Sequence, residues 1–386
     1  MRKVKTGIIG IGNMGTSHAI NLTEDHCPEM ELTAVADTSP ERRAWAKDNL
    51  PGVCVYGTAE ELLDSGRIEA VIIAVPHYFH PVYAIEAFKR GIHVMSEKPA
   101  GVYTRQVREM NKAAAESGVV FGLMFNQRTD HIYRKMRELV TSGKFGQIRR
   151  SNWLITNWYR PQAYYDSGSW RATWSGEGGG VLLNQCPHNL DLWQWICGMP
   201  TAITAKMCFG RWHDIEVEDD VTILAEYENG ATGVFVTSTG DFPGRNRFEV
   251  TLDRGNILID DGRLTVTELD MPEQEFSAVN TEIFGRPGYR VYSPETDGLN
   301  PQHIGVLNSF ASAILHGTPL VARGEEGING LMISNAAHLS AWTGETVSLP
   351  IDEDLYYNEL MKRVAVSKRK PDTVSRVADT KGTYGT

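Results

Sequence analysis

The strongest constraint on this chain is the glycine turn Gly10-Ile11-Gly12-Asn13-Met14-Gly15. The turn follows the apolar run 4–9 and opens a helix signal over 15–22. In such a strand–turn–helix unit, the first glycine permits the tight turn and the second lets backbone N–H groups approach a pyrophosphate. The third lets helix and strand pack closely, so phosphates lie at the helix N-terminus. The turn therefore predicts a dinucleotide site formed by Gly10, Gly12, Asn13, Met14 and Gly15.

An acidic residue closes the second predicted strand, 32–36. Asp37 lies where a carboxylate accepts hydrogen bonds from the adenosine ribose hydroxyls and repels a 2′-phosphate. This position favours NAD over NADP. The neighbouring pair Arg42-Arg43 is the competing detail, because guanidinium groups could instead bind a 2′-phosphate.

Strand and helix signals alternate through the first 125 residues, which predicts a doubly wound parallel sheet. After Asn126 the pattern changes to one helix, over 129–142, followed by strands of alternating polarity separated by turns. We therefore expect a Rossmann domain over 1–125 and an α+β domain with a large, mostly antiparallel open sheet over 126–350. A polar C-terminal tail is expected over 351–386.

Composition excludes several classes of protein. A chain of 386 residues with 22% charged side chains and a net charge of −10 is a poor candidate for binding nucleic acid or a membrane surface. No run approaches the roughly 18–20 apolar residues of a membrane span, and no secretory signal is evident. The five cysteines lack a CxxC pair, so we expect reduced thiols, no metal site and a cytoplasmic location.

A second motif, Glu97-Lys98-Pro99, ends the predicted strand 93–96. Ligands of open α/β sheets bind at the carboxyl ends of the strands. A partly desolvated Lys98 there could exchange a proton with a hydroxyl group, and Glu97 could orient it. On its own, the motif is equally consistent with a solvated surface lysine.

Taken together, the motifs resemble the Gfo/Idh/MocA family of oxidoreductases. The resemblance rests on the glycine turn, Ala74-Val75-Pro76 with His77 and His80, Glu97-Lys98-Pro99, Phe125-Asn126-Gln127-Arg128 and the segment 178–191. It covers most of 1–345 and implies that Lys98 lies between nicotinamide and substrate. It also implies further contacts to the cofactor from Ala74, Pro76, His77, His80, Glu97, Lys98 and Asn126.

The segment 178–191 supplies a second catalytic candidate. His188 matches the histidine that the family usually has and can act as acid or base. Asn184 stands where the family usually has aspartate, and an amide can only orient a hydroxyl by hydrogen bonding. We therefore assign proton chemistry to Lys98 and His188 and substrate binding to Asn184. A helix N-cap for Asn184 and a packed core position for His188 are the alternatives.

An aromatic and arginine-rich stretch, 153–174, precedes the glycines. Such side chains suit a sugar ring and its hydroxyls, although core packing would use them equally. Tyr159, Arg160 and Arg171 are the expected substrate contacts, together with Asn126 at the same sheet edge. The acidic segment 213–220 contains His213, but its alternation with Ile215 and Val217 favours an exposed strand edge over a metal site.

The expected activity is hydride transfer between nicotinamide and a secondary hydroxyl carbon of a sugar, glycoside or polyol. The alternative is an NAD-dependent glycosidase that oxidises C3 transiently, eliminates the glycosidic group, adds water and reduces the ketone again. Its base would be His188, Tyr159 or Tyr164. A non-catalytic NAD sensor is a third hypothesis, which the presence of Lys98 and His188 disfavours. The resemblance further implies a homodimer or homotetramer formed through the open sheet face.

Overall fold

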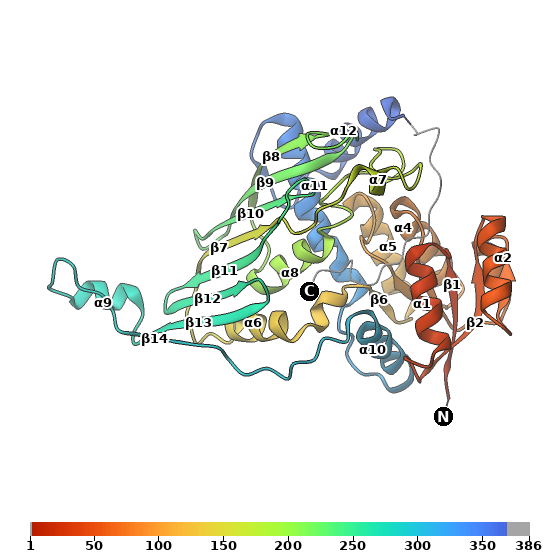
Figure 1. The fold of residues 1–386 in the computed structure, drawn as a ribbon, viewed down its shortest axis with the longest axis horizontal. Coiled ribbons are helices and arrows are strands. Elements are labelled where there is room, and N and C mark those ends of the chain that lie inside the picture. Colours follow the sequence, from red (N-terminus) through yellow and green to blue (C-terminus); the bar gives the residue numbers. More distant parts are fainter. Residues whose placement is uncertain (1, 369–386) are drawn as a thin grey trace.

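The computed structural model describes residues 2–368. Its first part is a six-stranded parallel sheet with strand order β3-β2-β1-β4-β5-β6 (Figure 1). This is the doubly wound order of a Rossmann fold, as predicted. Along the chain the elements are β1 (Val4–Ile9), α1 (Asn13–Thr23), β2 (Met30–Ala36), α2 (Pro40–Asn49), β3 (Cys54–Tyr56), α3 (Ala59–Leu63), β4 (Ala70–Ile73), α4 (His80–Lys89), β5 (His93–Ser96), α5 (Thr104–Ser117) and β6 (Phe121–Leu123).

Local sequence explains these elements. β4 is buried along its whole length, as expected for a strand covered by helices on both faces. The side chain of Ser39 caps α2, whose first residue is Pro40. Thr58 and Glu61 form a capping box at the start of α3. The capping residues Ser39 and Thr58 therefore mark where α2 and α3 begin.

The second part is a nine-stranded sheet with order β14-β13-β12-β11-β7-β10-β9-β8-β15. β7 and β10 pair in parallel, and every other neighbouring pair is antiparallel. The mostly antiparallel sheet expected from the alternating runs is thus confirmed. Its strands are β7 (Ile148–Ile155), β8 (Ala202–Phe209), β9 (Glu218–Glu226), β10 (Thr232–Ser238), β11 (Asn246–Leu252), β12 (Gly255–Asp260), β13 (Arg263–Leu269), β14 (Tyr289–Tyr292) and β15 (Val347–Ser348).

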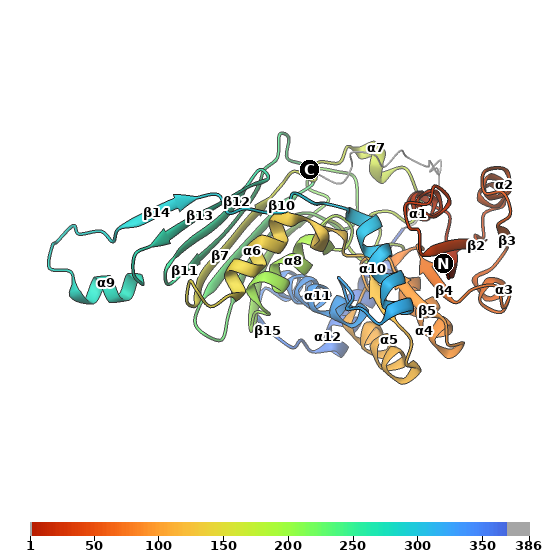
Figure 2. The same ribbon diagram turned by 90° about the horizontal axis from the view of Figure 1, so that it is seen from below.

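Helices cover one face of this second sheet (Figure 2). They are α6 (His131–Thr141), α8 (Pro187–Cys197) and α11 (Gly327–Thr343). A short helix, α7 (Gln162–Tyr165), lies in the loop between β7 and α8, and α9 (Glu273–Val279) lies on an arm that projects beyond β13 (Figure 1). The sheet and its helices bury side chains such as Trp153, Phe235 and Phe248 in one core.

Helix α10 (Gln302–His316) belongs by sequence to the second part but packs on the parallel sheet. Its residues Val306, Leu307 and Phe310 share a core with Val4 and Ile8 of β1. The chain thus crosses back after the second sheet, and α10 closes the face of the parallel sheet that α1 also covers (Figure 2). This crossing brings the start of α10 to the edge where the glycine turn lies.

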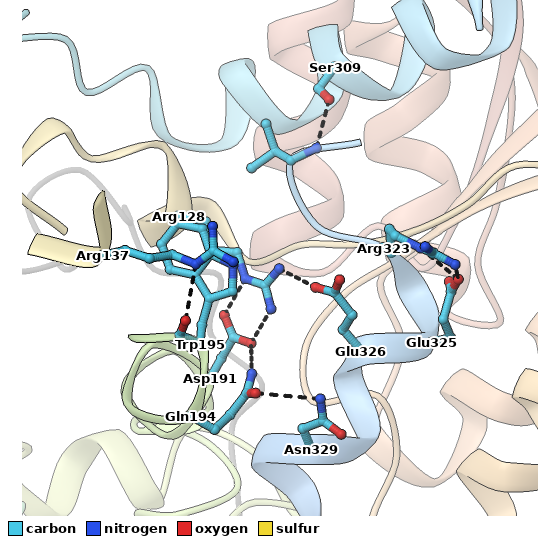
Figure 3. Close-up of polar contacts among 11 residues, drawn as sticks. Arg128, Arg137, Asp191, Gln194, Trp195, Ser309, Arg323, Glu325, Glu326 and Asn329 are labelled. Carbon is cyan, nitrogen blue, oxygen red and sulfur yellow. Dashed lines mark hydrogen bonds and ion pairs between the residues drawn. The ribbon is translucent and has the colours of Figure 1, made fainter. Parts of the chain in front are cut away.

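A buried ion-pair cluster ties the turn after β6 to α8 and to the start of α11 (Figure 3). The guanidinium of Arg128, in the short 3₁₀ turn 126–129, donates two hydrogen bonds to Asp191 of α8, at 2.6 and 2.7 Å, and a third to Glu326. Arg128 is 2% exposed and Asp191 is fully buried. The Asp191 carboxylate is therefore occupied by Arg128, and Gln194 also donates to it.

The expected polar tail, 351–386, begins with ordered structure. α12 (Glu353–Val366) buries Tyr356 and Leu360 against the main core, so this part of the segment is a packed helix. The ends of this helix carry charged residues, among them Glu353, Asp354 and Arg363, which made the segment resemble a polar tail. Residues 369–386 lie outside the described range. Over residues 2–368, no helix is long and apolar enough to cross a membrane.

Candidate active site

The glycine turn joins β1 to α1. Gly10 has φ +91°, and a Cβ on Gly15 would collide with the carbonyl oxygen of Gly10. The backbone itself therefore requires glycine at both positions, whether or not a ligand is bound. A Cβ on Gly12, in contrast, would meet no protein atom within 4 Å. The open space at Gly12, beside the N-terminus of α1, fits a pyrophosphate whose approach a side chain would block.

Asp37 ties this turn to the end of β2. Its two carboxylate oxygens accept hydrogen bonds from the N–H groups of Ile11, at 2.7 Å, and Ser39, at 2.8 Å. Each oxygen keeps a second lone pair that a ribose hydroxyl could use. Arg42 donates to the Ile11 carbonyl and to Thr16, and Arg43 donates to the carbonyls of 37 and 38. The competing arginines therefore already bind the protein, which favours NAD.

Two histidines follow β4 and brace the sheet edge. Both ring nitrogens of His80 lie 2.7 Å from a backbone carbonyl oxygen, that of Pro99 for Nδ1 and that of Val75 for Nε2. His80 therefore clamps the turn after β4 to the Lys98–Pro99 turn, which contains a cis peptide bond. His77 lies 3.2 Å from the carbonyl of Glu177 through Nδ1. The contact of His80 with the cofactor, expected from the resemblance, stays a prediction, beside this role in holding the turn.

Glu97 lies at the centre of a buried cluster behind Lys98. Its carboxylate is 2.6 Å from His18 Nε2 and accepts the main-chain N–H of Lys98 at 3.2 Å. Burial alone would raise the pKa of Glu97, but the hydrogen bond from His18 and the charges of His18, His303 and Lys98 bring it to about 2. Burial lowers the pKa of His303 to about 4. Glu97 therefore accepts a hydrogen bond from the backbone of Lys98, and its ionised form is favoured.

The Lys98 side chain reaches from β5 to the second part of the molecule. Its Nζ donates a hydrogen bond of 2.8 Å to the main-chain carbonyl of Asn184. Burial lowers the pKa of the Lys98 ammonium below its usual 10.5, whereas the carboxyl groups of Glu97 and Glu177 oppose this shift. A lysine so placed can lose and regain a proton more readily than a solvated one.

Asn184 lies in the turn before α8, whose N-cap is Cys186. The N-cap alternative for Asn184 is therefore wrong. Its side-chain oxygen accepts a hydrogen bond from Tyr164, at 3.2 Å, and its amide nitrogen donates to Glu177. Glu177, 2% exposed, also accepts the N–H of Ala172, and burial raises its pKa. The carboxyl group of Glu177 is thus next to the amide of Asn184, the residue that stands where family members usually have aspartate.

His188 is the second residue of α8 and is 2% exposed. Among the described residues, neither of its ring nitrogens has a hydrogen-bond partner. Burial, followed by the charge of Lys98, lowers its pKa well below 6.5, so the neutral imidazole is favoured. A buried ring with two unsatisfied nitrogens is costly unless a ligand completes its bonding. This argues against a simple core position.

The aromatic stretch brings two of its three predicted members towards Lys98. Arg171 donates to the Tyr164 hydroxyl at 3.0 Å, and the charges of Arg160 and Arg171 both act on Lys98. The ring of Tyr159 is 43% exposed and packs on Phe242 at the surface, so Tyr159 does not join this group. Asn126 is buried and donates to Gln302 of α10, whereas its side-chain oxygen has no partner among the described residues.

Sequence reasoning missed Glu177, His18 and the part played by Tyr164. The only sequence signal for Glu177 is its position directly before the glycines, seven residues from Asn184. His213 lies 3.1 Å from Asp219, and the Asp219 carboxylate also accepts the N–H groups of Arg211 and Trp212. These contacts close a turn. Residues 2–368 hold no group of three or more His, Cys, Asp or Glu side chains that could bind a metal ion.

Two family models match this chain. Residues 4–125 match the oxidoreductase family with an NAD-binding Rossmann fold, and residues 133–258 match the GFO/IDH/MocA C-terminal domain. The matches cover the parallel sheet and the second sheet from β7 into β12, and they include Gly10, Asp37, Lys98 and His188.

Relatives and solved structures agree with these models. The chain is 24% identical to myo-inositol 2-dehydrogenase of Thermotoga maritima over 90% of this chain and 98% of the relative. It is 28% identical to a 1-carboxy-3-chloro-3,4-dihydroxycyclohexa-1,5-diene dehydrogenase of Comamonas testosteroni, but over only 59% of this chain and 56% of that one. The WlbA dehydrogenase of Bordetella pertussis, solved with NADH and UDP-GlcNAcA, superposes with a TM-score of 0.76 at 24% identity, covering 91% and 100% of the chains. Levoglucosan dehydrogenase, solved with NADH, gives 0.75 at 22% identity with the same coverage.

Proposed function

Because this chain belongs to the GFO/IDH/MocA family of oxidoreductases, we propose that it transfers hydride between NAD and a secondary hydroxyl carbon of a sugar, glycoside or polyol. The observation that carries the proposal is the position of Lys98. The Lys98 side chain extends from the carboxyl end of a parallel strand, and its ammonium donates to the Asn184 carbonyl. His188 is nearby, and its two ring nitrogens have no hydrogen-bond partner among the described residues. The name of the Thermotoga maritima relative, an inositol dehydrogenase, supports a cyclic polyhydroxy substrate.

The residues that would hold NAD fit it. Gly12 and the N-terminus of α1 accommodate the pyrophosphate, and Asp37 retains lone pairs for the ribose. The unpaired oxygen of Asn126 is an acceptor that a carboxamide could fill. When bound, NAD supplies the acceptor or donor of the hydride.

Lys98 is the proposed acid and base. In the oxidation direction, Lys98 Nζ takes the proton of the substrate hydroxyl as the C–H bond breaks and the carbonyl forms. In the reverse direction it returns that proton to the oxygen. Because burial lowers the pKa of Lys98, the neutral amine forms more readily than in a solvated lysine. The Asn184 carbonyl orients Nζ.

His188 and Asn184 complete the proposed site. A neutral imidazole carries one donor and one acceptor, so His188 can bind the reacting hydroxyl while Lys98 exchanges the proton. Asn184 cannot titrate, and Glu177 and Tyr164 hold its side chain. We assign Asn184 the orientation of a neighbouring hydroxyl.

A redox glycosidase is the second candidate. It uses the same residues and needs a further base near the ring carbon next to the oxidised one. Tyr164 favours this candidate, because its hydroxyl lies between Arg171 and the Asn184 side chain.

One experiment separates the two reactions. The pure protein is incubated with NAD and free sugars or polyols, and separately with p-nitrophenyl glycosides, while NADH absorbance and phenol release are followed. NADH formed in proportion to a free sugar supports the dehydrogenase. Many turnovers of phenol release without net NADH would replace it with the glycosidase. Absence of both signals, with NADH binding intact, would point to a sensor.

A further inference from the structure

Two arginines beside Lys98 are held by aromatic rings instead of carboxylates. The guanidinium carbon of Arg171 lies 4.6 Å from the ring centres of both Tyr164 and Trp170. That of Arg160 lies 5.5 Å from the ring of Trp158 and 5.4 Å from that of Tyr164. Within residues 2–368, neither arginine forms an ion pair with a carboxylate, in contrast to Arg128 with Asp191 and Glu326.

Most donors of the two guanidiniums are still available. Arg171 gives one hydrogen bond, to the Tyr164 hydroxyl, and Arg160 gives one, to the carbonyl of Tyr159. Each guanidinium has five N–H donors in a planar fork that matches a carboxylate or phosphate. Both side chains are only partly buried, so a ligand could reach them.

The electrostatic surroundings point to the same ligand. The charges of Arg160 and Arg171 both lower the pKa of Lys98, whereas the carboxyl groups of Glu97 and Glu177 raise it. Glu177 is itself occupied by Asn184 and Ala172. In a protein with a net charge of −10, three cations thus stand with two carboxyl groups at this edge, and the two arginines have no carboxylate bound to them, so an anion could pair with them.

We infer that the substrate is an anionic sugar, whose carboxylate or phosphate group is bound by Arg160 and Arg171 while its hydroxyl reacts at Lys98. The inference rests on the proposed function for the hydroxyl chemistry and adds the charge of the substrate. Stacking on Trp158, Tyr164 and Trp170 fixes the two forks before the ligand arrives, which lowers the entropic cost of binding.

The test uses matched sugars that differ only in charge. For each of the gluco, galacto and manno series, the neutral sugar, its 6-carboxylate and its 6-phosphate are compared. Calorimetry measures their binding to the NADH-loaded protein, and NADH formation measures their oxidation. We expect one anionic form to bind about 10- to 100-fold more tightly than its neutral partner, the range of one or two charged hydrogen bonds. The preferred form identifies the anion as carboxylate or phosphate.

Three variants test the assignment. In Arg171→Met and Arg160→Met the ratio of anionic to neutral affinity should fall about tenfold or more, while the Kd of NADH stays at its wild-type value. Arg137→Met is the matched control, because Arg137 also stacks on a tryptophan, Trp195, and donates to its carbonyl, but on α6. It should keep the wild-type ratio.

The outcomes separate this inference from the proposed function. Equal affinity for anionic and neutral forms, no binding of any anion, or an unchanged ratio in Arg171→Met would overturn the inference. Loss of NADH affinity equal to the loss of anion affinity would also overturn it, because the arginines would then serve the cofactor. Arginine-dependent binding of an anion without any NADH formation would preserve the anion site and reject the proposed dehydrogenase.

Discussion

Lys98 Nζ and the main-chain carbonyl of Asn184 are joined by a hydrogen bond of 2.8 Å. The two residues lie 86 positions apart, one at the end of β5 and the other in the turn before α8. This bond places a lysine from the parallel sheet against the part of the chain that carries His188, Glu177 and Tyr164. The proposed acid and base is thus positioned by both halves of the molecule.

Glu177 should set the pH at which Lys98 works. Its negative charge raises the pKa of Lys98, against the lowering by burial, so Glu177→Gln should let that pKa fall further. A base acts when unprotonated, and the rising limb of kcat/KM against pH in the oxidation direction should therefore move to lower pH. The pH profile of sugar oxidation measures this shift. Glu138→Gln, on the exposed face of α6, is the control and should leave the limb in place. A limb that moves to higher pH in Glu177→Gln would refute the assignment.

Gly12 and Gly15 should fail in different ways when changed to alanine. Gly12→Ala should fold with a free energy of unfolding within about 0.5 kcal/mol of wild type, since its Cβ meets no protein atom. Its Kd for NADH, measured by fluorescence titration, should rise about tenfold or more. Gly15→Ala should instead lose stability, because its Cβ would collide with the Gly10 carbonyl. Wild-type NADH affinity in Gly12→Ala would show that the pyrophosphate does not lie there.

The buried pair Arg128–Asp191 should matter for stability more than for chemistry. Arg128→Met leaves Asp191 buried without its partner and should cost about 3–5 kcal/mol in urea unfolding. The double variant Arg128→Met, Asp191→Leu removes both charges and should recover most of that loss. If the double variant is as unstable as the single one, the cost lies in packing around Trp195 and Phe125 instead.

His80 should act on the site through the backbone. Its ring bridges the carbonyls of Val75 and Pro99 and therefore supports the turn that carries Lys98. His80→Ala should lower kcat for sugar oxidation about tenfold or more while changing the Kd of NADH little, because the two turns lose the ring that lies between them. A large rise in the Kd of NADH with unchanged kcat would return His80 to the role of a direct cofactor contact.

The parallel sheet could be predicted because its signals are local. The run 70–73, the Ser39-Pro40 start of α2 and the glycine turn each specify a strand, a cap or a turn within a few residues. The strand alternation of the second sheet is also local, although its strand order is not. The position of α10 on the parallel sheet depends on contacts more than 290 residues apart, such as Phe310 in one core with Ile8, and no local pattern contains them.

The residues of the candidate site also divide into those with a local sequence signal and those without one. Lys98 and His188 could be predicted because each lies in a motif at the end or start of an element. Glu177 could not, because it lies in the loop 166–186, which is largely irregular and whose path decides which side chains face Lys98. Tyr164, in α7, could be named only as a possible base, because its contact with Asn184 depends on the same path. The prediction for Tyr159 rested on residue type, and in the structure its ring packs on Phe242 in an irregular, exposed segment.

The most direct test of the account is the pH dependence of kcat/KM for sugar oxidation in wild type and Lys98→Met. The wild type should show a rate that rises with pH, with an apparent pKa below 10.5. Lys98→Met should lose that limb and about 10²–10⁴-fold in kcat/KM, the usual contribution of a general base, while still binding NADH. A Lys98→Met variant that keeps the limb and stays within about tenfold of the wild-type rate would contradict Lys98 as the group that exchanges the proton.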